Sequence, residues 1–165
     1  MIKTLSAAFA ALAMGFHSGG YAYAQDKQES QWSVQCDNAQ CQMYAEIRLG
    51  NGALFHNIVF RQIEDGRYAG IMKLPLGIHL PSGVKIGIDD DGIIEARLIT
   101  CRPDGCEAAF AATEGVVEYF KRGLLMSVVV RKVSDRQQMA MNYSLMGFTK
   151  AWSEFEKQSE ARKPK

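Results

Sequence analysis

This sequence of 165 residues has few histidines and almost no net charge. It contains three histidines, and 19 Lys and Arg residues against 18 Asp and Glu residues leave a formal net charge of +1. A balanced charge gives no electrostatic reason to expect a nucleic-acid partner, because proteins bind phosphate backbones mainly through an excess of Lys and Arg. Beyond its N-terminal segment the sequence also lacks the run of about 20 apolar residues that a membrane-spanning helix needs.

Sequence motifs of enzymes are missing as well. The sequence has no Gly-x-Ser-x-Gly and no Cys-x-x-Cys, which are typical of serine hydrolases and thiol-exchange enzymes. His56 lies in an alternating apolar run and is expected to pack in the core, whereas His79 lies in a loop and is expected to be exposed. We therefore expect no catalytic residue and no cofactor.

Three consecutive carboxylates, Asp89, Asp90 and Asp91, precede Gly92 and raise the question of a calcium site. Calcium prefers clustered oxygen ligands, but the alternating spacing and the terminal Glu of an EF-hand loop are absent. We interpret the segment as an acidic hairpin tip in water and expect no bound metal.

The N-terminus has the three parts of a secretory signal peptide. A positive start at 1–3 precedes an apolar stretch at 4–16, and Ala22-Tyr23-Ala24 forms a small-x-small cleavage site. We expect cleavage after Ala24 and export to the periplasm, the outer surface or the medium. The expected organisation is a signal peptide at 1–24, a single domain at 25–156 and a polar C-terminal tail at 157–165.

All four cysteines lie in the expected exported part, as two pairs with four residues between partners: Cys36 and Cys41, and Cys101 and Cys106. Three connectivities are possible. Pro-Asp-Gly within the second loop is a turn sequence, and the first loop is polar and equally long, so bridges within two hairpins are favoured. Two cysteine pairs also fit a zinc site, although an oxidising compartment favours disulfides.

Alternation of apolar and polar residues with a period of two recurs along the chain and predicts a mainly β fold. Turn sequences rich in Gly, Asn and Asp separate the alternating runs, which is typical of a compact β-sandwich or barrel-like domain. The run at 124–133 is apolar on both faces and is expected to be a central strand. The expected strands cover 32–36, 41–49, 54–63, 68–74, 84–88, 93–100, 124–133 and 136–143.

Two helices are expected late in the chain. Thr113 is a suitable N-cap for a helix that buries Phe120, carries a Glu118–Arg122 pair outside and ends at Gly123. Apolar residues at helical spacing between Phe148 and Phe155 predict a C-terminal helix that packs an aromatic stripe on the sheet.

The sequence resembles the invasion-associated locus B family through five short motifs in the same order. Each motif is weakly specific alone, and together they cover nearly the whole expected domain. The motifs are Trp32-x-x-x-Cys36, Leu74-Pro75-Leu76-Gly77-Ile78, Gly83-Val84-x-Ile86-x-Ile88-Asp89, Cys101-x-x-x-Gly105-Cys106 and Ser144-Leu145-x-Gly147-Phe148-x-x-Ala151.

The resemblance implies an exported or envelope-located protein of α-proteobacteria with a compact β-sandwich fold, in a family named after a factor linked to entry into host red cells. The resemblance assigns no catalytic residues to this sequence. We expect a non-enzymatic factor that contacts a protein or a cell surface. A periplasmic inhibitor, for example of lysozyme, and an envelope hydrolase dependent on His56 or His79 are the alternatives.

Binding residues are common in loops held by a rigid scaffold, so two loops are the expected contact regions. These loops carry Leu76, His79 and Ser82 in the first and Asp89, Asp90 and Asp91 in the second.

Overall fold

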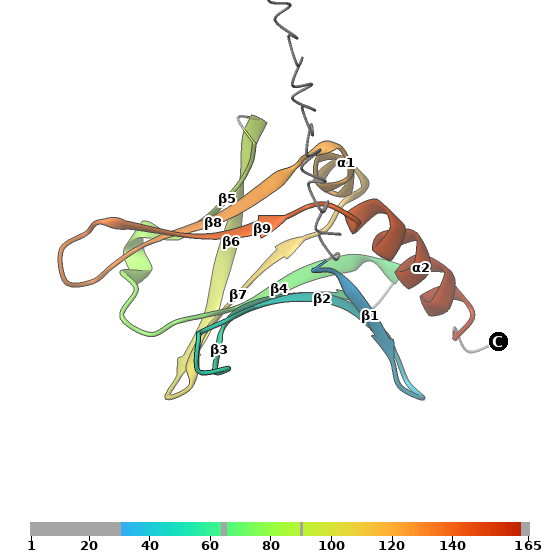
Figure 1. Cartoon of the computed structure of the whole chain (residues 1–165), viewed down its shortest axis with the longest axis horizontal. Helices are drawn as coiled ribbons and strands as arrows, with labels where there is room; N and C mark the ends of the chain where they lie inside the picture. The colour runs from blue at the N-terminus through green and yellow to red at the C-terminus, as the bar shows by residue number, and fades with distance from the viewer. Residues whose placement is uncertain (1–30, 64–65, 90, 163–165) are drawn as a thin grey trace, which may run out of the picture.

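The computed structural model describes residues 31–63, 66–89 and 91–162, and the predicted signal peptide lies outside them. The described residues form nine strands, two α-helices and the 3₁₀ turn η2 (Figure 1). The strands are β1 (Ser33–Cys36), β2 (Cys41–Arg48), β3 (Leu54–Gln62), β4 (Tyr68–Leu74), β5 (Val84–Ile88), β6 (Asp91–Arg102), β7 (Gly105–Ala111), β8 (Leu125–Arg131) and β9 (Gln138–Ser144). The other elements are η2 (Leu80–Ser82), α1 (Glu114–Arg122) and α2 (Phe148–Glu160).

All nine strands belong to one antiparallel sheet with the order β1-β2-β3-β4-β7-β6-β5-β8-β9. The long strand β6 joins its two halves, because its first part pairs with β5 and its second part with β7. A register shift between Leu98 and Thr100 lies on the β7 side of β6, and such bulges bend a strand. The sheet therefore curls so that its halves face one another (Figure 1), which confirms the expected mainly β, sandwich- or barrel-like domain.

The edges of the curled sheet approach each other where β9 ends. Trp32 Nε1 donates a hydrogen bond to the Ser144 carbonyl at 2.9 Å, and the Ser144 N–H donates to Gln31 Oε1 at 3.2 Å. Beside this seam, α2 contacts β1 and β2 and covers the open side of the sheet.

An aromatic cluster centred on Phe60 fills the interior. The Phe60 ring has no exposed surface and lies 5.4–5.9 Å from five other rings, most of them edge-on. These rings come from segments far apart in the sequence, so the cluster ties both helices to the sheet. They belong to Trp32, Phe110, Phe120, Phe148 and Trp152.

The period-two pattern predicted most strands closely, but it did not predict β7. Its sequence, Gly-Cys-Glu-Ala-Ala-Phe-Ala, is rich in alanine, which has little intrinsic preference for strands. The segment becomes a strand because it lies between β4 and β6 and pairs with both. The predicted central strand, β8, does have a neighbour on each side, β5 and β9.

Helix α1 begins as expected, with the Thr113 hydroxyl accepting a hydrogen bond from the Val116 N–H at 3.4 Å. The expected Glu118–Arg122 ion pair is wrong. Glu118 pairs instead with Lys121 at 2.9 Å, while Arg122 Nε donates to the Glu118 carbonyl at 3.2 Å. Lys121 and Arg122 both lie at helical spacing from Glu118, and the bond to the backbone carbonyl occupies the Arg122 Nε–H.

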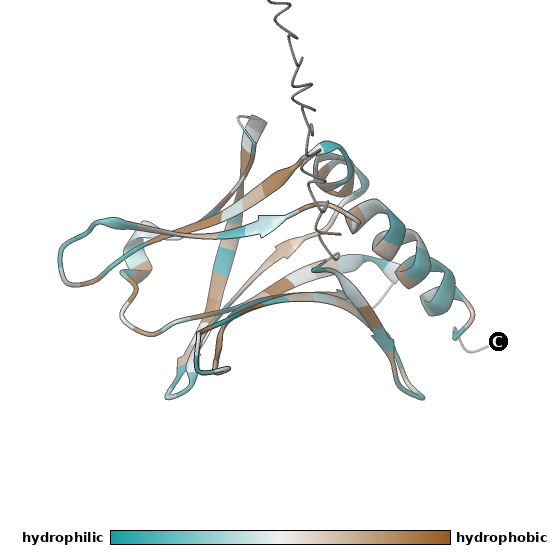
Figure 2. Cartoon of the chain, viewed as in Figure 1, coloured by the Kyte–Doolittle hydropathy of each residue, from teal (hydrophilic) through white to brown (hydrophobic). Residues whose placement is uncertain are grey.

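Helix α2 starts at Phe148 after Gly147, whose φ of 82° is accessible to glycine at little cost. It packs Trp152 and Phe155 inward, as the aromatic stripe predicted, and its outer side is hydrophilic (Figure 2). The helix continues to Glu160, past residue 157, where the sequence suggested the start of a polar tail. Ser159 is buried, so this last turn belongs to the folded domain.

Gly70 in β4 provides a test of core packing. It pairs directly with Phe110 of β7, and an added Cβ would overlap the Phe110 ring, which Phe60 and Phe120 hold in place. We expect Gly70→Ala to lower the free energy of unfolding by about 1–3 kcal/mol, as overpacking does. Urea unfolding followed by tryptophan fluorescence measures this loss of free energy of unfolding.

The matched control is Gly87→Ala in β5, where an added Cβ meets no atom within 4 Å. We expect a change within about 0.5 kcal/mol for this variant. Equal effects of the two substitutions would contradict the packing account.

Candidate interaction surface

Both disulfides close their hairpins locally. Cys36 is bonded to Cys41 and Cys101 to Cys106, and each pair is also directly opposite in the strand register. This confirms the favoured connectivity. It also overturns the zinc alternative, because oxidised sulfurs are not thiolate ligands.

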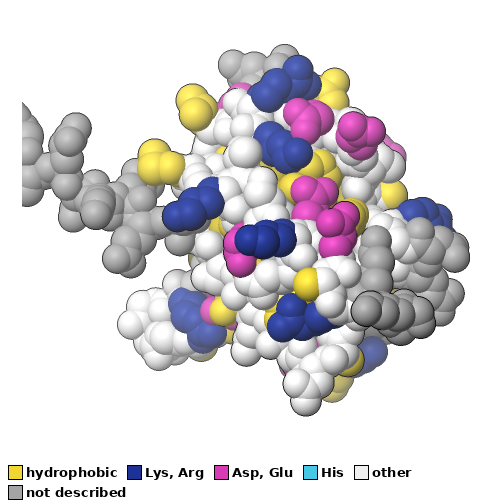
Figure 3. Space-filling model, turned by 90° about the vertical axis from the view of Figure 1, so that its right-hand side faces the viewer, with side chains coloured by type: hydrophobic (Ala, Val, Ile, Leu, Met, Phe, Trp, Pro, Cys, Tyr) yellow, Lys and Arg dark blue, Asp and Glu magenta, His cyan; other side chains and the backbone are white. Residues whose placement is uncertain are grey.

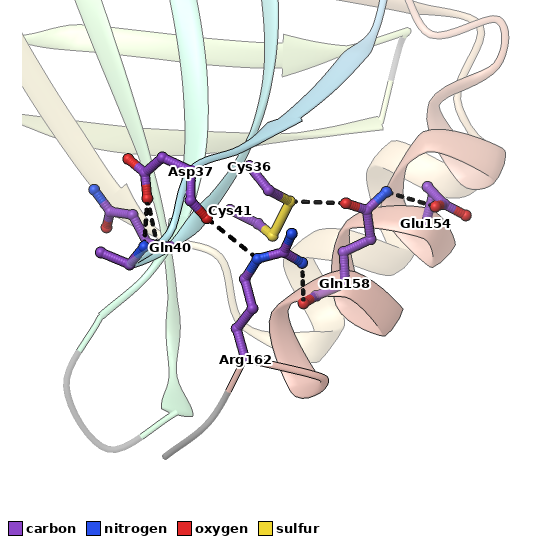
Figure 4. The surroundings of a disulfide bond; sticks show 8 residues. Cys36, Asp37, Gln40, Cys41, Glu154, Gln158 and Arg162 are labelled. Atoms are coloured by element: carbon purple, nitrogen blue, oxygen red, sulfur yellow. Dashed lines mark hydrogen bonds between the residues drawn. A yellow bond between two sulfur atoms is a disulfide. The ribbon is translucent and has the colours of Figure 1, made fainter.

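The first disulfide lies between the β1–β2 turn and the end of α2 (Figure 4). The Asp37 carboxylate accepts hydrogen bonds from the backbone N–H groups of Ala39 and Gln40 at 2.7 and 2.8 Å, and these bonds hold the pKa of Asp37 below its ordinary value. Arg162 Nε donates to the Asp37 carbonyl at 3.2 Å, which fastens the last turn of the chain to this hairpin. We assign this region a structural role.

His56 has no exposed surface, which confirms its interpretation as a core histidine. Its Nδ1 is hydrogen-bonded to the hydroxyl of Tyr143 from the opposite half of the sheet, while its Nε2 has no partner among the described residues. Burial lowers the pKa of His56 to about 4, and burial together with the Glu46 charge raises the pKa of Tyr143. His56 is therefore neutral at neutral pH and out of reach of a substrate.

His79 is half-buried rather than exposed, so its expected exposure is wrong. Its Nδ1 is hydrogen-bonded to Ser82 Oγ at 2.6 Å, and the Ser82 N–H donates to the His79 carbonyl at 3.1 Å. Both bonds lie within one short turn and connect its ends. They fix the shape of η2.

The loop at 76–82 is held against the end of β8, far away in the sequence. The His79 N–H donates to the Arg131 carbonyl, the Val133 N–H donates to the Gly77 carbonyl, and Ile78 pairs with Lys132 as an isolated antiparallel bridge. The loop therefore forms one unit with the β8–β9 turn. We call this unit, residues 76–85 together with 131–138, the tip.

Apolar side chains are exposed on the tip. Leu76, Leu80 and Val133 have 55, 48 and 54% of their surface exposed, although the backbone that carries them is fixed by the bonds above. Figure 1 shows the tip projecting from the sheet at the end opposite α2.

Positive charge is concentrated on the same unit. The tip contains Lys85, Arg131, Lys132 and Arg136 and a single acid, Asp135, which gives a net charge of +3 with His79 neutral. Asp135 lies 3.3 Å from Lys132, and its pKa is lowered by the Gln137 N–H and by Lys132. By contrast, basic and acidic side chains are interspersed on the side of the molecule that carries the helices (Figure 3).

The second expected contact region lies at the other end of β5. Asp89, with φ 47°, accepts hydrogen bonds from the N–H groups of Leu124 and Leu125, both at 2.9 Å, so its carboxylate joins two parts of the fold. Asp90 and the side chain of Asp91 lie outside what the structure describes. The two expected loops are therefore separate surfaces.

Sequence reasoning found the loop at 76–82 but not the hairpin that supports it. About 50 residues separate the two segments, and no local pattern indicates their pairing. The one feature of the sequence that could have drawn attention to the hairpin is its basic turn at 131–136, which reads Arg-Lys-Val-Ser-Asp-Arg.

A profile of the family described as Invasion associated locus B (IalB) protein matches residues 29–156. The chain belongs to the invasion-associated locus B family. Two curated relatives, invasion protein B homologs of Brucella abortus strain 2308 and of Brucella abortus biovar 1 strain 9-941, are each 29% identical over 137 residues. Each match covers 79% of this chain and 78% of the relative.

A crystal structure of invasion associated protein B from Bartonella henselae has the same fold as this invasion-associated locus B protein. The two superpose with a TM-score of 0.72 at 19% identity, over 79% of this chain and 95% of the other. Among the described residues of this family member, no helix is long and apolar enough to cross a bilayer.

Acid should destabilise the protein through His56. A histidine whose pKa falls from 6.5 unfolded to about 4 folded binds fewer protons in the native state, so stability is lost as pH falls from about 6.5 towards 4. We expect the free energy of unfolding to drop by about 2 kcal/mol between pH 7 and pH 5 from this group alone. Urea titrations at both pH values measure the drop.

The control is the double variant His56→Phe/Tyr143→Phe, which removes both hydrogen-bonding partners together and leaves no buried polar group behind. Its stability should change by about 2 kcal/mol less over the same pH interval. An unchanged pH dependence would contradict the assignment to His56.

Proposed function

We propose that this invasion-associated locus B protein is an exported, non-enzymatic contact factor that binds a cell surface through its tip. The observation that carries the proposal is the tip itself, where exposed leucines and a net positive charge stand on a backbone fixed by hydrogen bonds. A rigid scaffold that presents exposed apolar side chains is typical of an interaction site.

Two further observations support export and contact. Both disulfides fit an oxidising compartment outside the cytoplasm. The Brucella relatives and the Bartonella structure carry names that refer to invasion, and we extend that role to this chain as part of the proposal.

The arrangement of the histidines supports the non-enzymatic part of the proposal. A nucleophilic site needs an accessible base beside an activated hydroxyl or thiol, with a third group orienting the base. His56 is enclosed in the core, and the hydrogen bond between His79 and Ser82 closes a turn within four residues. Turnover by the purified protein in a hydrolase screen, lost in His79→Ala, would contradict this part.

Location is the first prediction of the proposal. Protease added to intact cells of the native organism should digest the protein while a periplasmic marker stays protected, because a contact factor must be exposed. Immunoblotting with antibody against the folded domain detects the loss. Protection until the outer membrane is opened would place the protein in the periplasm and exclude direct cell contact.

Binding is the second prediction. Protein purified from an exporting strain should bind intact mammalian cells in flow cytometry. The tip variant Leu76→Ser/Leu80→Ser/Arg131→Gln/Arg136→Asn should bind at least about tenfold more weakly, because each change removes a contact or a charge at the interface.

The control for this experiment is Ile93→Ser/Ile99→Ser, which removes two apolar side chains of 65 and 59% exposure from β6, outside the tip. This variant should bind like the wild type. Equal binding by all three proteins would contradict the placement of the contact surface at the tip.

A further inference from the structure

We infer that the surface recognised by the tip is an anionic lipid bilayer: lipid phosphates lie against Lys85 and Arg131, and Leu76, Leu80 and Val133 enter the headgroup layer. This inference rests on the proposed function and specifies the partner. Four structural observations carry it.

The first observation is that the apolar side chains are exposed, with no element of the described part of the chain covering them. Val133 donates its N–H to the Gly77 carbonyl, and Leu76 precedes Gly77. Leu80 begins η2, and the residue before it, His79, donates its N–H to the Arg131 carbonyl. Because the backbone is anchored at both points, a large rearrangement of the loop would break these bonds. Apolar side chains fixed on a projecting end are suited to insertion into an interface.

The second observation is that the charge of the tip is available for a partner. Its single acid, Asp135, is already engaged by Lys132 and by the Gln137 N–H at 3.0 Å. Arg131 Nη1 donates to the Arg136 carbonyl at 2.8 Å, a bond to a neutral acceptor, and no acid of the described residues pairs with this guanidinium. A cluster of Lys and Arg beside apolar groups is the pattern that anionic leaflets attract.

The third observation is a hollow of about 260 Å³ beside η2. Lys85 from β5 and Arg131 from β8 line it from two strands, and Ser82 and Gln138 add polar groups. A lipid phosphate requires donors of this kind, and both basic residues that line the hollow stand on paired strands.

The fourth observation is that the apolar and basic residues belong to one projecting unit of the fold. The residues that carry the apolar side chains and the cations belong to one unit, the tip, whose backbone projects from the sheet (Figure 1). Contact with a flat anionic surface requires both kinds of group on one projecting end. An apolar hollow on the outer face of β4, β7 and β6, lined by Ile63, Ile99 and three alanines, has 490 Å³ but only one charged lining residue, Arg97. The tip is the surface whose chemistry matches phospholipid.

Vesicle co-sedimentation of the protein purified from an exporting strain tests the inference. Vesicles of phosphatidylcholine with about one third phosphatidylglycerol should bind the protein at least about tenfold more tightly than phosphatidylcholine alone. Raising the salt to about 0.5 M NaCl should remove most of this preference, because exposed charges are then screened.

Two paired variants separate the contributions. Arg131→Gln/Arg136→Asn should weaken binding to the anionic vesicles by at least about tenfold, since each cation near such a surface strengthens binding roughly fivefold. Asn is used at position 136 because φ there is 62°, a conformation that Asn tolerates. Leu76→Ser/Leu80→Ser should weaken binding to the anionic vesicles both before and after the salt is raised, since the insertion of apolar side chains is insensitive to charge screening.

The matched controls remove equal groups from elsewhere and should bind like the wild type. Lys150→Gln/Lys157→Gln removes two exposed charges from α2, and Ile93→Ser/Ile99→Ser removes two exposed apolar side chains from β6. Urea unfolding of every variant confirms that a loss of binding is not a loss of folding.

Three outcomes would overturn the inference. Tip-dependent binding to cells without vesicle binding would make the partner a protein and leave the proposed function standing. Vesicle binding that depends on the arginines but not on the leucines, and that inorganic phosphate competes away, would indicate a soluble phosphate ligand. Equal loss in the control and tip variants would mean non-specific adsorption.

Conversely, tip-dependent vesicle binding by a protein that proves inaccessible on intact cells would support the lipid inference and overturn the proposed function.

Discussion

The packing of aromatic rings around Phe60 is the interaction on which the rest of the structure depends. A nine-stranded sheet exposes one whole face unless it curls or is covered, and here it does both. The rings of Phe148 and Trp152 pack on Phe60 and hold α2 on the open side of the sheet, and the Phe120 ring packs on Phe60 and holds α1 there as well. With the helices in place, the seam between the sheet edges closes through Trp32 and Ser144.

The rigidity of the tip follows from this arrangement. Strand β5 pairs with β8 on the same curled half of the sheet, and β8 continues past it to hold the loop at 76–82. The two disulfides do not fix the tip, because they close the β1–β2 and β6–β7 turns. Backbone hydrogen bonds of the strands and of the loop at 76–82 position its leucines and arginines, so the backbone of the proposed contact surface is held by the sheet itself.

The pair formed by His56 and Tyr143 places a polar contact inside a mainly apolar interior. It joins β3 to β9, which are the third strand from one end of the sheet and the last strand at the other. The period-two pattern correctly predicted that His56 points inward, since only its neighbours along the strand decide that. Its partner comes from 87 residues away, and no local pattern indicates it.

The sequence by itself determined the mainly β class, most strands, both helices and the family, because alternation, caps and short motifs are local properties of the chain. It favoured the local disulfides, which the structure then decided. It also singled out the loop at 76–82. Only the tertiary structure decided that the alanine-rich β7 is a strand, that Asp89 holds Leu124 and Leu125, and that the loop joins a basic hairpin to form the tip. Each of these depends on a partner segment distant in the sequence, which for β7 is β4, and pairing over such distances leaves no signal in either segment alone.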